Sequence, residues 1–167
     1  MTHPVSARTV FTSPIHFLAF GLGSGLAPKA PGTFGTLAAI PLYLIMAQWS
    51  LSTYLLVVLL AFVLGVWICG ESAQRLGQHD YGGIVWDEFV GFWITLIAAP
   101  RLGGWEVLLG FILFRWFDIV KPWPIKWADD KVSGGLGIML DDVLAGVMAW
   151  VCLQLGAYFI ATVFAFN

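Results

Sequence analysis

Acidic side chains occur as adjacent pairs at two places where an apolar stretch begins. Asp87 and Glu88 lie between "GGIVW" and "FVGFW". Asp141 and Asp142 stand before another apolar segment, and Asp118 interrupts a third. Oxygen donors without histidine or cysteine favour a hard cation such as Mg²⁺ over zinc. Carboxylates with lysines and arginines nearby are the parts of a metal-assisted phosphoryl hydrolysis site.

Each acidic pair also has a structural explanation. Successive residues of a helix point about 100° apart, so Asp87 and Glu88 can serve one site only near a helix end, where they also complement the helix dipole. Either Asp141 or Asp142 can cap the helix that follows, although capping needs one acid and not two. The preceding "SGGLG" (133–137) predicts a flexible turn whose N–H groups can approach an anion. The sequence leaves ligation and capping open.

Two cations flank the acid at position 118. Arg115, Asp118 and Lys121 are spaced three residues apart and form one stripe at the end of an apolar segment. They are either an ion-paired ladder at a membrane interface or a metal ligand, Asp118, between two phosphate-binding cations. Both arrangements need a helix that ends here, as Pro122 and Pro124 predict.

The composition places these groups in a membrane protein. Hydrophobic residues make up 59% of the chain, charged residues 11%, and the mean hydropathy is +0.86. Soluble domains average about a quarter charged residues, so this chain is expected in a bilayer. The net charge of −2 argues against a nucleic-acid partner. Cys69 and Cys152 lie in apolar segments and are predicted to be buried, without a disulfide or a zinc site.

The elements that position these residues are predicted to be helices, because lipid leaves open backbone groups unsatisfied. We predict an all-α, polytopic membrane helix bundle in one domain, 1–167. Its five apolar segments are roughly 34–50, 52–69, 89–100, 105–120 and 143–165. Only the second and fifth come close to the about 20 residues of a secure crossing. Residues 1–16 are predicted to be a poorly ordered tail.

Positive charge predicts the orientation. With five crossings and the N-terminus inside, the cytoplasmic segments 1–33, 70–88 and 121–142 contain six of the eight Lys and Arg residues, whereas the opposite face contains only Arg101. Cytoplasmic loops carry such an excess. All the motifs above then face the cytoplasm, as expected of an enzyme that acts on a lipid headgroup. The alternative function, a small transporter or ion-binding protein, predicts acids near mid-membrane.

Three blocks of the sequence together resemble a known family. They are "GLGSGLAPKAPGTFGTLAAIP", "IVWDEFVGFW" and "FRWFDIVKPWPI…GGLGIMLDDVLAG". In this order they are similar to the phosphatidylglycerophosphatase A family of bacterial inner-membrane lipid phosphatases, from about Phe17 to Gly146. The resemblance implies a helical, multi-pass membrane enzyme that uses Mg²⁺ to remove the terminal phosphate of the lipid phosphatidylglycerophosphate. The products are phosphatidylglycerol and inorganic phosphate.

The resemblance also suggests roles for single residues. The expected ligands of one or two Mg²⁺ ions are Asp87, Glu88, Asp118, Asp141 and Asp142. A metal-polarised water then attacks phosphorus, and Asp87 or Glu88 accepts its proton. A carboxylate nucleophile that forms an acyl-phosphate is the mechanistic alternative. Two further candidates inside the family blocks are Asp80 and Asp129.

The loop "APKAPGTFGTLAA" (27–39) is expected to help bind phosphate. The predicted phosphate-binding residues are Lys29, Thr33, Arg115 and Lys121. Pro28 and Pro31 fix the loop backbone, while Gly32 and Thr33 present N–H and O–H groups. The alternative is a rigid helix entry, capped by Thr33 or Thr36. The predicted partners are therefore the lipid substrate and the bilayer.

Overall fold

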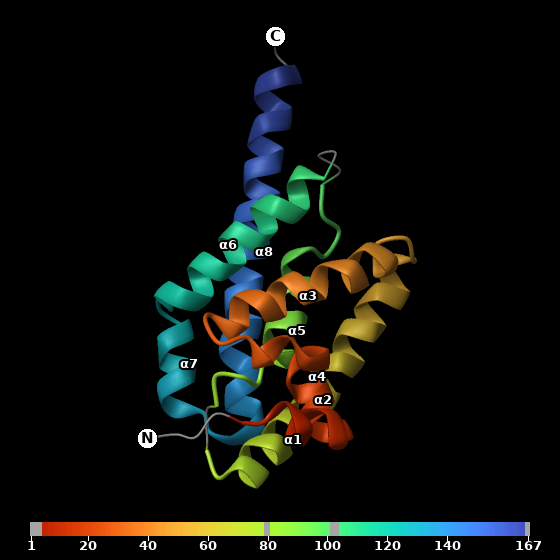
Figure 1. Ribbon diagram of the computed structural model, residues 1–167. Helices are drawn as coiled ribbons and strands as arrows, with labels where there is room; N and C mark the ends of the chain where they lie inside the picture. The colour runs from red at the N-terminus through yellow and green to blue at the C-terminus, as the bar shows by residue number, and fades with distance from the viewer. Residues whose placement is uncertain (1–4, 79–80, 101–103, 166–167) are drawn as a thin grey trace.

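The computed structural model describes residues 5–78, 81–100 and 104–165. Every regular element in these ranges is helical, which confirms the predicted all-α class. The elements are α1 (Ala7–Thr12), α2 (Pro14–Ala19), η1 (Gly21–Leu26), α3 (Pro31–Met46), α4 (Leu51–Leu76), α5 (Trp86–Thr95), α6 (Trp105–Val120), α7 (Ile125–Lys131) and α8 (Gly134–Ala165). The long α8 runs through the molecule, and the other helices gather around its N-terminal part (Figure 1).

Local signals set the ends of the helices. The Ser50 side chain caps α4 by accepting a hydrogen bond from the N–H of Thr53 at 3.2 Å. Gly77 ends α4 with a left-handed φ of 66°. α3 begins at Pro31, because a first-turn residue needs no N–H. α6 ends at Val120, and the next residue, Lys121, turns the chain toward α7 with a left-handed φ of 45°.

The short helix α5 lies at the centre of the core. It packs against α8, α3, α4 and α6, and Phe89, Val90 and Phe92 are fully buried. The apolar segment predicted at 89–100 therefore owes its composition to burial by neighbouring helices. The ten residues of α5 are too few for the about 20 that a perpendicular crossing needs.

Glycines allow α5 and α8 to approach closely. A Cβ atom on Gly146 of α8 would fall on the carbonyl oxygen of Gly91 in α5. A Cβ atom on Gly91 would lie 2.6 Å from the Asp142 carbonyl oxygen and 2.6 Å from the Phe114 ring. The two backbones are thus in direct contact, which no larger residue at either position permits.

Two helices are long and apolar enough to cross a membrane among the residues described: α4, and α8 over Gly134–Ile160. Leu59, Leu60 and Val63 of α4 are each more than half exposed, so α4 presents a broad apolar surface. This supports membrane association, while the five crossings and their orientation stay predictions. Cys69 is buried as predicted, but Cys152 is exposed, so the prediction for Cys152 is wrong.

The segment predicted to be a poorly ordered tail is helical where the structure describes it. Over residues 5–16 it forms α1 and the start of α2, and Val10 is fully buried. The Val5 N–H donates a hydrogen bond to the Tyr81 hydroxyl at 3.1 Å. These contacts attach residues 5–16 to the bundle, and residues 1–4 lie outside the described ranges.

Candidate active site

A cavity of about 180 Å³ lies where the first turns of α5 and α8 meet the end of α6. The described residues that line it are Gly82, Ile84, Asp87, Glu88, Asp118, Lys121, Asp129, Val132, Gly137, Ile138, Asp141 and Asp142. The fold therefore brings all five predicted metal ligands, which come from three separate helices, to one cavity. Asp129 and Lys121, also predicted from the sequence, complete its charged lining.

Asp87, Glu88 and Asp142 form the acidic cluster of this cavity. One carboxylate oxygen from each residue lies within 4.8 Å of the other two. α5 contributes Asp87 and Glu88 from its first turn, so two successive residues reach one site, as a helix end permits. α8 contributes Asp142 from the opposite side of the close helix crossing.

α8 begins earlier than the sequence predicts. It starts at Gly134, about two turns before Asp141 and Asp142, so neither acid caps a helix and the flexible turn predicted at 133–137 is wrong. Asp141 and Asp142 are buried against the cavity instead of facing lipid, which is why a helix tolerates both of them near its start.

The acidic cluster and its neighbour Asp141 hold buried oxygens that lack hydrogen-bond partners. These atoms are Asp87 Oδ1, Glu88 Oε2, Asp141 Oδ1 and Asp142 Oδ2. The exposed fraction of Asp142 is only 3%. A buried carboxylate without a partner is costly unless it binds a cation or a proton. The all-oxygen donor set fits Mg²⁺, whose ligands are carboxylate, phosphate and water oxygens.

Burial also changes the proton affinity of the acidic pair on α5. Burial, followed by the negative charges of Glu88 and Asp142, raises the pKa of Asp87 well above its ordinary value. Burial raises the pKa of Glu88 to about 7. A nearby cation favours the charged carboxylate and opposes both effects. The pair can therefore hold either protons or a cation, as a site that combines general-base and metal chemistry requires.

Lys121 is the cation that lines the cavity in the described part of the chain. Its Nζ lies 2.7 Å from Asp141 Oδ2 and 2.9 Å from Asp129 Oδ1. Burial lowers the pKa of Lys121, but the hydrogen bonds and charges of these two carboxylates outweigh burial and raise the pKa above its ordinary value. Lys121 is therefore positively charged at neutral pH and lies beside the acidic cluster.

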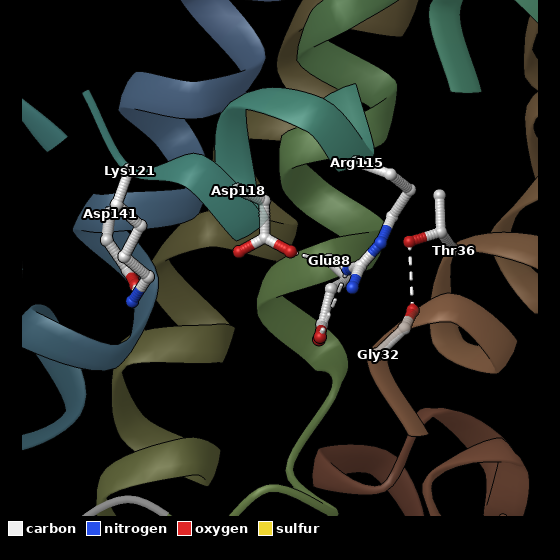
Figure 2. A network of polar contacts seen from close by, with 7 residues as sticks. All are labelled: Gly32, Thr36, Glu88, Arg115, Asp118, Lys121 and Asp141. Atoms are coloured by element: carbon white, nitrogen blue, oxygen red, sulfur yellow. Dashed lines mark hydrogen bonds and ion pairs between the residues drawn. The ribbon is translucent and has the colours of Figure 1, made fainter. Parts of the chain in front are cut away.

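Arg115 lies differently. It is not among the described residues that line the cavity, and its Nη1 lies 2.6 Å from Asp118 Oδ2 and 3.7 Å from Glu88 Oε1. Figure 2 shows its guanidinium beside Glu88 and toward Gly32 of α3. The ion-paired ladder predicted as one alternative describes the Arg115–Asp118 pair, whereas Lys121 pairs with other helices.

Comparison with known proteins identifies the family. A family model described as phosphatidylglycerophosphatase A matches residues 17–157. The chain belongs to the phosphatidylglycerophosphatase A family. This membership confirms the resemblance seen in the sequence blocks and the predicted enzyme class, a phosphatase.

Relatives of the phosphatidylglycerophosphatase A family cover most of the chain. Phosphatidylglycerophosphatase A of Escherichia coli K12 is 50% identical over 143 residues, which are 86% of this chain and 83% of that protein. The protein of that name from Haemophilus influenzae is 47% identical over 138 residues, with 82% and 85% covered. A Bacteroides thetaiotaomicron protein whose name proposes phosphatidylinositol-3-phosphatase activity is 40% identical over 148 residues, with 84% and 91% covered. No solved structure matches.

Three further predicted site residues from the family blocks are not among the described residues that line the cavity. Lys29 is exposed, Thr33 is half-buried, and neither lines the cavity. The Thr33 N–H donates a hydrogen bond to the carbonyl of Ala30 at 2.9 Å. Asp80 lies outside the described residues. Phosphate binding by Lys29 and Thr33 therefore stays a prediction.

The start of α3 shows what the sequence motif did not reveal. No side chain caps this helix, so the predicted capping by Thr33 or Thr36 is wrong; the Thr36 hydroxyl donates to the Gly32 carbonyl at 2.9 Å instead. Gly32 lies directly against Glu88 and Arg115. The available signal was a glycine inside the first helical turn, where the backbone itself requires none.

Proposed function

We propose that this protein hydrolyses phosphatidylglycerophosphate to phosphatidylglycerol and inorganic phosphate, with Mg²⁺ as its cofactor. The observation that carries the proposal is the acidic cluster, whose buried oxygens lack hydrogen-bond partners beside the charged Lys121. The family and the names of its relatives in Escherichia coli and Haemophilus influenzae support the choice of substrate.

The residues of the cavity divide the reaction among them. Mg²⁺ held by Asp87, Glu88 and Asp142 would neutralise phosphate charge and lower the pKa of water. The oxygen of a water molecule attacks phosphorus, and Asp87 or Glu88 accepts the proton of that water. The bond from phosphorus to the glycerol oxygen breaks, and that oxygen takes up the proton that the carboxylate accepted from water. Lys121 balances negative charge on the phosphate oxygens.

The remaining predicted ligands surround this arrangement. Asp118 lines the cavity beside Arg115, and Asp141 lines it beside Lys121, so both can contribute to a second Mg²⁺ or orient these cations. The acyl-phosphate route, in which a carboxylate attacks phosphorus, uses the same cavity. The stereochemistry at phosphorus would distinguish the two routes, because two successive displacements through an acyl-phosphate retain the configuration and direct attack by water inverts it.

We propose that the protein is a multi-pass protein of the bacterial inner membrane with its cavity on the cytoplasmic side. Support comes from the long apolar helices α4 and α8 and from the six Lys and Arg residues in the segments assigned to that side. Phosphate release that is faster from inside-out than from right-side-out membrane vesicles is the expected outcome.

The decisive experiment measures phosphate release from phosphatidylglycerophosphate by the detergent-solubilised protein. We expect turnover with Mg²⁺, loss of turnover with EDTA, and at least about 100-fold loss in Asp142→Asn. Asp130→Asn is the matched control, because Asp130 is exposed and does not line the cavity. Phosphatidylinositol 3-phosphate is the comparison substrate, and faster release from it would contradict the proposed specificity. Divalent-ion transport without phosphate release would favour the transporter alternative.

A further inference from the structure

Gly32 in the first turn of α3 leaves space that a Cβ atom would take from the Glu88 side chain, whereas its backbone conformation does not need glycine. It lies inside a regular α-helix and does not adopt a left-handed φ. A Cβ atom at this position would fall on Glu88 Oε1 and would lie 3.0 Å from Arg115 Nη1. The α3 backbone is therefore in van der Waals contact with a carboxylate of the acidic cluster and with the cation paired to it.

Arg115 occupies the space between two of the carboxylates that line the cavity. The exposed fractions of the Arg115, Glu88 and Asp118 side chains are 13%, 12% and 14%. The guanidinium pairs with both acids but is not itself among the described lining residues. Arg115 Nη1 therefore faces both carboxylates as an ion-pair partner, although neither Nη1 nor Nε makes a hydrogen bond with a described residue.

A side chain of α3 also binds the backbone of its first turn. The buried Thr36 hydroxyl donates a hydrogen bond to the Gly32 carbonyl at 2.9 Å, one turn along the helix. Figure 2 shows Thr36 and Gly32 on one side of Arg115, with Glu88 and Asp118 between Arg115 and the Lys121–Asp141 pair. The first turn of α3 thus contacts both the Glu88 carboxylate and the Arg115 guanidinium.

We propose that Gly32 and Arg115 are positioning residues, which together form a back wall that fixes the Glu88 and Asp118 carboxylates toward the cavity. This inference rests on the proposed function of that cavity as a divalent-cation and phosphate site. It assigns Arg115 to the carboxylates and not to substrate phosphate, and it explains the Pro-Gly start of α3 as a close-fitting contact. Pro31 starts the helix, and Gly32 keeps its first turn thin enough for Glu88.

Gly32→Ala tests the steric half of the wall. We expect Mn²⁺ binding, measured by electron paramagnetic resonance without substrate, to weaken at least about tenfold, because the added methyl displaces the Glu88 carboxylate. Turnover should fall in parallel while the helical circular dichroism is kept. Gly156→Ala is the matched control, since Gly156 is also helical and an added Cβ there meets nothing within 4 Å. Unchanged Mn²⁺ binding in folded Gly32→Ala overturns the proposal.

A double variant tests whether Gly32 acts through Glu88. Glu88→Asp shortens the side chain by one methylene and leaves room for the added methyl. We therefore expect Gly32→Ala with Glu88→Asp to bind Mn²⁺ more tightly than the product of the two single losses predicts. Independent, multiplicative losses would overturn the steric coupling. This comparison also covers the case in which Gly32→Ala folds poorly, because the double variant relieves the overlap.

Arg115→Gln separates positioning from phosphate binding. Positioning predicts that kcat falls and Mn²⁺ binding weakens, while the KM for lipid and inhibition by inorganic phosphate change less than about twofold. Arg115→Lys should restore part of the Mn²⁺ affinity, because it returns the charge without the planar fork. Weaker phosphate inhibition with unchanged Mn²⁺ affinity would overturn the proposal. Mn²⁺ binding can be measured without turnover. Unchanged Mn²⁺ affinity in the variants would therefore contradict the positioning role, whereas absence of phosphate release from the unaltered protein would contradict the proposed lipid hydrolysis.

Discussion

Arg115 and Lys121 lie six residues apart near the end of α6, yet they face different surroundings. Arg115 lies within the helix, behind Glu88 and Asp118, and does not line the cavity as described. Lys121 follows the last helical residue, and its left-handed φ of 45° turns it into the cavity. The exposed fraction of the side chain is 13% for Arg115 and 28% for Lys121. A helix end therefore separates two cations that sequence spacing places on one stripe.

The chemistry of the two side chains suits these places. A guanidinium is planar and presents donors in a fixed fork, so Arg115 is suited to hold two carboxylates at fixed positions. A lysine ammonium is a point charge on a flexible stem, so Lys121 can exchange a carboxylate partner for a phosphate oxygen. The comparison thus distinguishes a wall side, with Arg115, from a ligand side, with Lys121.

The largest effect is expected where the two sides meet. Glu88 belongs to the acidic cluster and also faces Arg115, so Glu88→Gln removes one predicted metal ligand and one partner of the wall. We expect kcat to fall at least about 100-fold and Mn²⁺ binding to weaken. Phosphate release and Mn²⁺ titration check this. A variant that retained full turnover would contradict any role of Glu88 on either side.

Lys121→Met is expected to be next in size. It removes the cation of the ligand side while the wall stays intact, so the KM for lipid should rise about tenfold. Inhibition by inorganic phosphate should weaken with it, whereas Mn²⁺ affinity should not fall. This pattern is the opposite of that expected for Arg115→Gln, and steady-state kinetics of both variants in one assay compare them directly. Matching patterns for the two variants would abolish the distinction between the sides.

Asp129→Asn should have a smaller effect. Its side chain is 39% exposed and is one of two carboxylates paired with Lys121. Exposed ion pairs contribute less than about 1 kcal/mol, so the free energy of unfolding should change little. We expect a change in KM below about threefold, because Asp141 still holds Lys121. A larger loss in Asp129→Asn than in Lys121→Met would show that Asp129 acts directly and not through the lysine.

The smallest effect on turnover is expected for Cys69, which belongs neither to the wall side nor to the ligand side. Cys69 is fully buried in α4, and its Sγ contacts Met139 Sδ at 3.9 Å. Cys69→Ser should leave kcat and KM unchanged and should lower the free energy of unfolding by about 1–3 kcal/mol, because the buried hydroxyl lacks a comparable partner. Loss of turnover without unfolding, measured by phosphate release and circular dichroism, would instead indicate a thiol-dependent reaction.

The sequence predicted helix type better than helix boundaries. Hydropathy identified the apolar stretches of α3, α4, α6 and α8, because membrane and core helices both need apolar residues. It could not reveal that the apolar side chains of α5 are buried by other helices, because core burial and lipid contact favour the same residues. It also placed the start of α8 too late, because glycines and paired acids usually mark a turn or cap. Here those acids are stabilised by the cavity, which only the tertiary structure forms.

The predicted site residues divide in the same way. The carboxylates could be predicted because oxygen-rich pairs beside apolar runs have few other uses. The direction in which Arg115 faces could not, since three-residue spacing fixes a helix face but not the helices that pack against it. The role of the Pro-Gly start of α3 was also hidden, because the contact between Gly32 and Glu88 joins residues 56 positions apart.

The glycine contact between α5 and α8 has a consequence for the proposed Mg²⁺ site. Gly91 lies four residues after Asp87, and Gly146 lies four residues after Asp142, so the backbones touch one turn away from the facing carboxylates. The distance between the two helices beside these acids is consequently set by main-chain contacts and not by side chains that can change rotamer. At the proposed Mg²⁺ site, a gap set in this way would favour an ion whose radius lets it reach both helices at once.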